Sequence, residues 1–241
     1  MNIKELYITI LIVIVSCVSL SLPAYGKCFS FNVGDFDELK VEDDLSIVCH
    51  CNSDSVGLVK FECDQRTADR IMLRNSKGKL KIELVYDERK YGMLPVITVY
   101  TNQVKKVEND GIGTLNIQGN VSCTKAEFAL TGNGRLTVDN VQCDELILRI
   151  STGCGTITAK GSCGVEKIRN LGTGLIEATD VTTSDVQARI FGTGIVKCKV
   201  NDGGKINLKG SGSGRLYYIG EPAKVTVKKL GSLKALPLQG H

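Results

Sequence analysis

The chain has 241 residues with 26 glycines, four prolines and no tryptophan, and 30 Lys and Arg against 26 Asp and Glu give a net charge of +4. This small charge, with basic residues that form no evident stripe alongside aromatics, argues against a nucleic-acid partner. Beyond the N-terminal segment we find no convincing amphipathic helix, whereas apolar and polar residues alternate along much of the chain, which favours β-structure.

The N-terminal 26 residues have the pattern of an export signal. Lys4 precedes an apolar stretch (residues 6–22) that ends in small residues, so we predict cleavage after Gly26 and a mature chain that begins at Lys27. The expected location is the periplasm, the cell surface or the extracellular space. Two alternatives stay open: an uncleaved anchor, because about 17 apolar residues are near the lower limit for a span, and lipidation at Cys17, which follows a lipobox-like Ile-Val-Ser.

Residues 27–104 alternate between apolar and polar side chains without a fixed repeat. The open end of a solenoid core needs atypical coils to cover it. We therefore predict that this segment is an irregular β capping region, continuous with the repeats that follow. Its strand-like runs are Leu39–Val41, Leu45–Val48, Val59–Phe61, Leu80–Leu84 and Val96–Tyr100.

Six Gly-x-Gly triplets then recur at steps of 19 to 21 residues. A fixed period in this range indicates a stacked solenoid, whose repeats bury their apolar faces against each other. Glycine is expected at each corner because positive φ is cheap only for glycine. A dinucleotide site is excluded because no helix follows the glycines. The corner residues are Gly111, Gly113, Gly132, Gly134, Gly153, Gly155, Gly172, Gly174, Gly192, Gly194, Gly212 and Gly214.

Each triplet leads into a run in which apolar and polar residues alternate, and a second alternating run follows about ten residues later. Alternation at period two indicates a half-buried strand. Two short strands and two bends in about 20 residues make one coil. The sequence thus predicts an all-β fold, a right-handed parallel β-solenoid over residues 105–235, with a short C-terminal tail at 236–241.

Nine cysteines remain if the signal is removed, an odd number for an exported chain. Cys123, Cys143 and Cys163 lie 20 residues apart, so they should stack on consecutive coils, either in a disulfide or as small buried residues of a core ladder. For Cys49 and Cys51 we expect side chains on the same side of a strand. A disulfide from one of them to Cys63 is favoured over a metal site.

The order of these segments, and the ending Tyr218-Ile219-Gly220-Glu221-Pro222, resembles one known family across residues 36–235. It is the "putative auto-transporter adhesin, head GIN domain" family of exported bacterial β-solenoids. The resemblance implies the solenoid fold and an envelope location, and it carries over no functional residues. This chain departs from the family's usual Ser-Gly-Ser-Gly corners, which it keeps only at residues 211–214, and its cysteines are unusually many.

For function we expect an exported, non-catalytic envelope protein that binds a protein or polysaccharide surface. We expect no catalytic, cofactor or metal residues, no nucleic acid, and membrane contact only through the signal segment or a lipid at Cys17. Histidine is absent from the repeats, and no acidic pair recurs on adjacent coils as acid–base catalysis would need. The alternatives are a polysaccharide lyase or hydrolase, and a structural or assembly element of the envelope.

Overall fold

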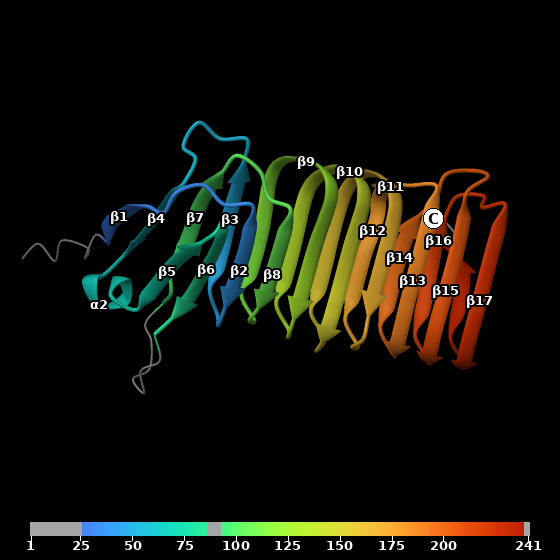
Figure 1. The fold of residues 1–241 in the computed structure, drawn as a ribbon. Helices are drawn as coiled ribbons and strands as arrows, with labels where there is room; N and C mark the ends of the chain where they lie inside the picture. Colours follow the sequence, from blue (N-terminus) through green and yellow to red (C-terminus); the bar gives the residue numbers. More distant parts are fainter. Residues whose placement is uncertain (1–25, 86–92, 239–241) are drawn as a thin grey trace, which may run out of the picture.

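The computed structural model describes residues 26–85 and 93–238. The predicted signal segment up to Tyr25, including Cys17, lies outside the described residues. The protein is all-β, with 69% strand and 2% helix, and forms a parallel β-solenoid of about 7 turns with roughly 20 residues per turn (Figure 1). This confirms the predicted fold class.

The elements follow one another along the chain as short strands interrupted by one helical turn. In order they are β1 (Lys27–Asn32), β2 (Glu38–Glu42), β3 (Ser46–Cys51), β4 (Leu58–Cys63), α2 (Gln65–Ala68), β5 (Ile71–Ser76), β6 (Lys79–Leu84), β7 (Val96–Thr101), β8 (Lys106–Asp110), β9 (Thr114–Thr131), β10 (Arg135–Thr152), β11 (Thr156–Asn170), β12 (Leu175–Thr182), β13 (Asp185–Gly192), β14 (Ile195–Lys199), β15 (Lys205–Gly212), β16 (Arg215–Ile219), β17 (Lys224–Gly231) and β18 (Lys234–Pro237).

Two flat faces run along the solenoid, and we name each by its last strand. The β17 face contains β5, β6, β2 and β8, the second halves of β9, β10 and β11, and then β13, β15 and β17. The β18 face contains β1, β4, β7 and β3, the first halves of β9 to β11, and then β12, β14, β16 and β18. The faces meet at a glycine edge, formed by the Gly-x-Gly triplets, and at a cysteine edge, which holds Cys123, Cys143 and Cys163.

The core lies between the two faces and consists of columns of apolar side chains in register. The second residue after each triplet is apolar and fully buried, and it pairs with its equivalent on the next coil. Full burial of such a side chain stabilises the fold by about 1.5–3 kcal/mol relative to exposure. The column on the β18 face is Leu115, Leu136, Ile157, Ile176, Val196 and Leu216.

The early coils do not stack in chain order. Strand β2 pairs in parallel with both β6 and β8, and β3 pairs with both β7 and β9. The β2–β3 coil therefore lies between the β6–β7 coil and the β8–β9 coil. Antiparallel pairs, β1 with β4, β4 with β7 and β5 with β6, complete this N-terminal end. They form the irregular cap on the parallel coils, and the insertion of one coil between two later ones was not predictable from alternation.

The cysteine edge differs from the two-bend prediction in the first repeats. Strands β9, β10 and β11 continue around this edge without a break, because their turns also pair in register, for example Cys143 with both Cys123 and Cys163. The bend is taken up by a register shift after Val138. Separate short strands on each face appear from β12 onward.

The two ends of the solenoid differ. At the N-terminal end Phe29, Phe31 and Phe61 stack with ring centroids 5.5–6.3 Å apart. At the other end the core columns finish in Val225 and Val227, which remain 39% and 37% exposed. Strand β17 also carries several lysines, a usual protection against edge-to-edge pairing. In the described part of the chain no helix has the length and apolar character to cross a membrane.

Candidate functional site

The first glycines of the triplets adopt two backbone conformations. Gly111 and Gly172 do not have a positive φ. The other four do, and a residue with a Cβ is strained there. These four are Gly132 (119°), Gly153 (83°), Gly192 (118°) and Gly212 (106°).

A buried asparagine accompanies each of the two triplets without positive φ. The amide of Asn170 donates to the Gly174 carbonyl at 2.8 Å, and its oxygen accepts from the Gly172 N–H at 3.3 Å. Asn109 makes the same two bonds at its own triplet, at 3.0 and 3.2 Å. The side-chain oxygen thus pairs the N–H of the first glycine, while the second glycine's carbonyl also accepts from the backbone of the next coil. These two asparagines were not predicted from the sequence, although each lies two positions before its triplet.

The second glycine of every triplet is required because the coils pack closely there, and not because of its backbone φ angle. None of the six has a positive φ. A Cβ on Gly134 would lie 2.7 Å from the carbonyl oxygens of both Gly111 and Gly113 on the preceding coil. The expectation that all twelve corner glycines need positive φ is therefore wrong for eight of them, where no positive φ is found. Close stacking of the coils is the physical reason at the second position.

Gly153→Val is expected to lower the free energy of unfolding by more than ~1 kcal/mol. The residue has φ of 83°, and a Cβ would meet the Gly132 carbonyl oxygen and lie 2.7 Å from the Asn133 side-chain oxygen. Urea unfolding measures the change. The control is Thr193→Val, which introduces the same residue at an exposed position next to a corner. Parent-like stability of both Gly153→Val and Gly192→Val would contradict the role assigned to these corners.

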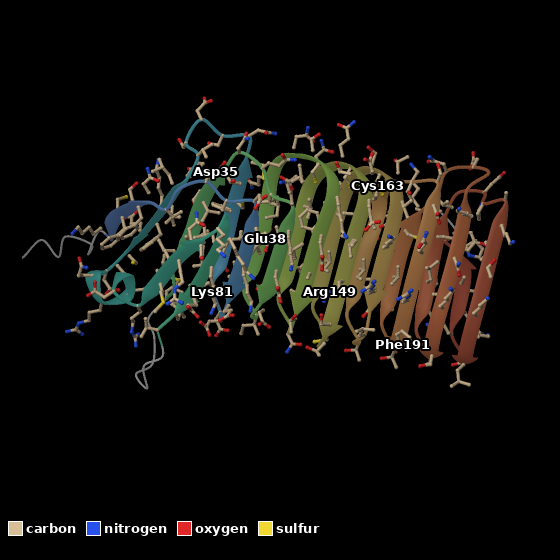
Figure 2. All side chains as sticks on the ribbon, in the orientation of Figure 1. Asp35, Glu38, Lys81, Arg149, Cys163 and Phe191 are labelled. Carbon is tan, nitrogen blue, oxygen red and sulfur yellow. The ribbon has the colours of Figure 1, made fainter. Side chains whose placement is uncertain are left out.

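Cys123, Cys143 and Cys163 form an in-register ladder at the cysteine edge, as predicted. They are half-buried free thiols in a shallow groove of ≈ 570 Å³ that also contains serine and threonine side chains. Burial raises the pKa of both Cys143 and Cys163 to about 12. A thiol with so high a pKa is a poor nucleophile at neutral pH. Cys163 lies at the upper rim in Figure 2, opposite the glycine edge.

Four further strand cysteines, Cys49, Cys51, Cys63 and Cys198, are core residues, whereas Cys28 on β1 is exposed. Cys49 and Cys51 point into the core on β3, as expected, while His50 points outward and stacks on Tyr100 at 5.2 Å. The predicted disulfide to Cys63 is wrong, because β7 lies between β3 and β4. Two strand spacings are about 9.6 Å, beyond the ~7 Å limit for bridged Cα atoms. Cys198 is fully buried in the core.

Several acidic side chains on the described coils pair with neighbouring groups. Asp180 lies 3.5 Å from the Lys160 amine, and the Asp202 carboxylate accepts from the Glu221 N–H at 3.0 Å. Within the residues that the structure describes, no group of three or more His, Cys, Asp or Glu is placed to hold a metal ion.

Glu166 is the exception among the acidic residues. It is fully buried, and neither carboxyl oxygen has a hydrogen-bond partner. It occupies a core position between Leu146 and Val186 on the adjacent coils. Burial raises its pKa to about 8. Because it lies inside the core, it affects stability and cannot reach a ligand on either face.

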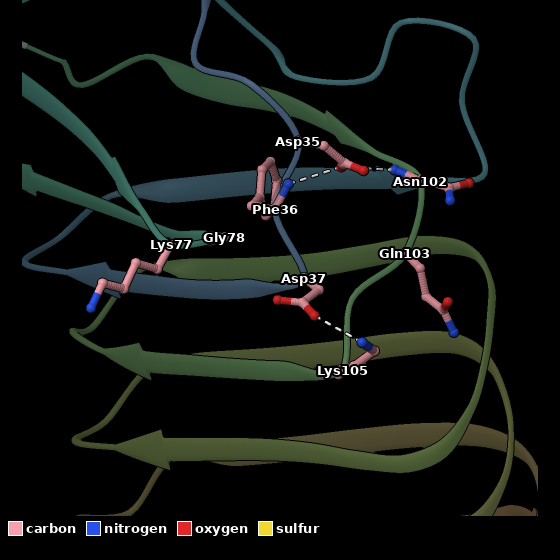
Figure 3. A pocket seen from close by; sticks show the side chains of 8 residues that line it. All are labelled: Asp35, Phe36, Asp37, Lys77, Gly78, Asn102, Gln103 and Lys105. Carbon is pink, nitrogen blue, oxygen red and sulfur yellow. Dashed lines mark hydrogen bonds and ion pairs between the residues drawn. The ribbon is translucent and has the colours of Figure 1, made fainter.

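A small pocket of ≈ 370 Å³ lies in the N-terminal region, where β2 follows β1 (Figure 3). Its polar groups are already paired: the Asp35 carboxylate accepts from the Phe36 N–H at 2.8 Å, and Asp37 lies 2.9 Å from the Lys105 amine. Thr101 also donates to Asp35 at 2.8 Å. These bonds fix the chain crossing between early coils, so the pocket has a structural explanation.

The β17 face carries a feature that sequence analysis missed. Five basic residues occupy one column, each paired in register with the next. At about 4.8 Å per strand the column is about 19 Å long. The expectation that Lys and Arg form no stripe is thus wrong, because the 19–21-residue steps bring them together. This basic ladder consists of Arg149, Arg169, Arg189, Lys209 and Lys228.

Most of the ladder lacks counter-ions. Arg149 lies 3.4 Å from the Glu127 carboxylate, whereas the other four members have no carboxylate partner among the described residues. The same column further toward the N-terminus contains Lys40 and Lys81, and both form ion pairs with Glu42, at 2.7 and 2.9 Å. At the N-terminal end of the column Arg74, in register with Lys81, contacts only the Met72 sulfur among the described residues, and on the later coils four consecutive cations are unpaired. Figure 2 shows Arg149 on the face and Phe191 at its lower rim.

These features define a repeat protein with two flat faces, a rigid stack of coils and a basic array on one face. The chain belongs to the family described as "Putative auto-transporter adhesin, head GIN domain", whose model matches residues 35–222. This confirms the family predicted from the sequence. Among curated proteins none matches this chain.

Solved structures with the same fold include proteins from Bacteroides and Parabacteroides. A putative adhesin from Bacteroides fragilis aligns with a TM-score of 0.76 at 15% identity, covering 88% of this chain and 96% of that one. A putative adhesin from Parabacteroides merdae gives 0.71 at 16% identity, with 90% and 98% covered. A putative lipid binding protein from Parabacteroides distasonis gives 0.67 at 17%, with 90% and 98% covered.

Proposed function

We infer that the protein is an exported, non-catalytic module of the cell envelope that adheres to a partner through its flat faces. The observation that carries this inference is the basic ladder, a regular and exposed array on a rigid face. Solenoids offer extended surfaces on which each coil repeats the same contact. Family membership and the names of the similar structures, two adhesins and a lipid binding protein, support binding in preference to catalysis.

The arrangement of titratable groups supports a non-catalytic role. Acid–base catalysis requires groups within hydrogen-bond reach of a reacting atom and with pKa values matched to the task. The carboxylates on the faces serve as ion-pair partners, as Glu177 does for Lys197 at 2.8 Å. The acid with the most favourable pKa, Glu166, is sealed inside the core.

Export is tested by the mass of the mature protein from its native host. We expect Lys27 as the first residue, because the preceding small residues fit signal-peptidase cleavage. A diacylated species that begins at Cys17 would instead establish a lipoprotein. A full-length chain in the membrane fraction would establish an uncleaved anchor.

The purified mature chain is expected to turn over no substrate. It would be incubated with plant, host-mucin and bacterial polysaccharides, with and without Ca²⁺, while reducing ends and unsaturated products are measured. Asp180→Asn and Asp202→Asn are the matched variants, because these carboxylates are exposed on the coils. Turnover that disappears in either variant would replace the binding module by the enzyme alternative.

A further inference from the structure

We propose that the basic ladder binds an extended anionic polysaccharide, one that carries carboxylate, sulfate or phosphate groups along its chain, laid parallel to the solenoid axis. This inference rests on the proposed function and names the ligand class for the β17 face. Three independent features of the face support it: the unpaired charge, the row of side chains beside it, and the direction in which both rows run.

An external anion would stabilise the unpaired positive charge of the ladder. Like charges directly opposite each other on neighbouring strands destabilise a sheet. Arg169 and Arg189 are exposed and adjacent in register, and Lys209 continues the column. The fold neutralises Lys40 and Lys81 of this column with Glu42 but supplies no carboxylate to these three residues. An anionic chain on the face would remove this repulsion, and arginine suits carboxylate, sulfate and phosphate because its planar group donates in pairs.

A row of hydrogen-bonding side chains runs beside the ladder, two residues earlier on each strand. Gln187, Asn207 and Thr226 are in register on consecutive coils. The side-chain oxygen of Asn207 is buried and has no partner. Two shallow hollows of ≈ 200 and ≈ 190 Å³ lie along these rows. Amide and hydroxyl groups both donate and accept, so this row can bind sugar hydroxyls while the ladder binds the acidic groups.

The linear arrangement favours a polymer over a membrane surface. Four of the unpaired cations form one row, whereas Lys224 and Lys229 lie outside it on the last strand of the face. The row beside the ladder is mostly neutral: Gln187, Asn207 and Thr226 follow the ion-paired Lys167. A lipid surface attracts cations anywhere on a facing surface and gains nothing from their alignment. A polymer that runs along the axis can repeat one contact per coil. Nucleic-acid bases stack on aromatic side chains, and on the described strands of this face the single exposed aromatic is Phe191, at the rim.

The test measures binding of the full mature chain to polygalacturonate, with neutral dextran as the uncharged control. The ladder variant is Arg169→Gln/Arg189→Gln/Lys209→Gln. The matched control variant is Arg135→Gln/Lys199→Gln/Arg215→Gln, which removes three exposed cations from the β18 face and changes the net charge equally. Urea unfolding establishes that both variants are folded, and the ladder variant should be at least as stable as the parent because it loses like-charge neighbours.

We expect the parent to bind polygalacturonate and not dextran, and the ladder variant to bind at least about tenfold more weakly. The slope of log affinity against log salt should fall by about 2, since each contact releases counter-ions. The control variant should stay within about twofold of the parent. Equal losses in both variants would overturn the proposal, because net charge alone would then explain binding.

Two further probes separate the ligand classes. Vesicles that contain phosphatidylglycerol, or duplex DNA, bound more tightly than polygalacturonate with the same dependence on the ladder, would overturn the polysaccharide assignment in favour of that ligand. If the parent and the ladder variant retain native envelope material equally, the proposed binding module stands, but the proposal that the ladder is the binding site is overturned. Failure of the parent to retain any envelope component would instead count against the proposed function itself.

Discussion

Glu166→Leu is expected to raise the free energy of unfolding by about 3 kcal/mol at pH 7. The side chain is fully buried between Leu146 and Val186, and both of its oxygens lack partners. Burial disfavours the charged form and raises its pKa from 4.5 to about 8. Folding at neutral pH therefore requires uptake of a proton, and a leucine like that on the preceding coil removes this cost.

The same residue gives the stability a defined dependence on pH. Between about pH 4.5 and pH 8 the folded state holds a proton that the unfolded state has released. The free energy of unfolding should therefore fall by about 1.4 kcal/mol for each pH unit across this window, and level off above it. Carboxylates whose pKa is lowered, such as Glu42, change the free energy of unfolding only below this pH window. The thiols of Cys143 and Cys163 act above it.

Urea unfolding at several pH values between 5 and 8 measures both effects. Glu166→Gln separates them, because it removes the titration but keeps a buried polar group, so it should abolish the slope and stabilise less than leucine does. Glu221→Gln is the control, since Glu221 is an exposed carboxylate. If the parent and Glu166→Leu show the same slope, the carboxyl of Glu166 is not the group that titrates.

The solenoid itself was predictable because its signal is periodic. Glycine triplets at steps of 19–21 residues and alternating strands fix the number of residues per coil, and the structure has the same coils. The N-terminal order was not predictable, because alternation indicates strands at β2, β3, β6 and β7 but not which of them are neighbours. Pairing of strands distant in sequence depends on the packing of the whole end of the molecule.

The basic ladder could have been found from the sequence but required the register. Arg149, Arg169, Arg189 and Lys209 are 20 residues apart, the same step that aligns the glycines. Searching for a stripe along the chain misses them, because their proximity exists only after the coils stack. The burial of Glu166 could not be predicted for a different reason: glutamate usually prefers the solvent, so a glutamate at a core position is not expected.

Asn170→Ala is expected to lower the free energy of unfolding by about 2 kcal/mol. Asn170 is fully buried between Ile150 and Ile190, so its bonds to the backbone of Gly172 and Gly174 have no water to replace them. Removal of the side chain leaves the Gly172 N–H unpaired, at a cost of about 1–3 kcal/mol, whereas the Gly174 carbonyl still accepts from the Ile195 N–H at 3.0 Å.

The prediction applies to the corner at Gly172 and not to the corners at which the first glycine has a positive φ. Gly132, Gly153, Gly192 and Gly212 reach their corners at positive φ without an asparagine, whereas Gly172 depends on Asn170 for a different conformation. Asn140→Ala, at an exposed turn on the opposite edge, is the control and should change stability by less than about 0.5 kcal/mol. A loss below about 1 kcal/mol for Asn170→Ala would show that the corner converts to the positive-φ form, which would make the asparagine dispensable.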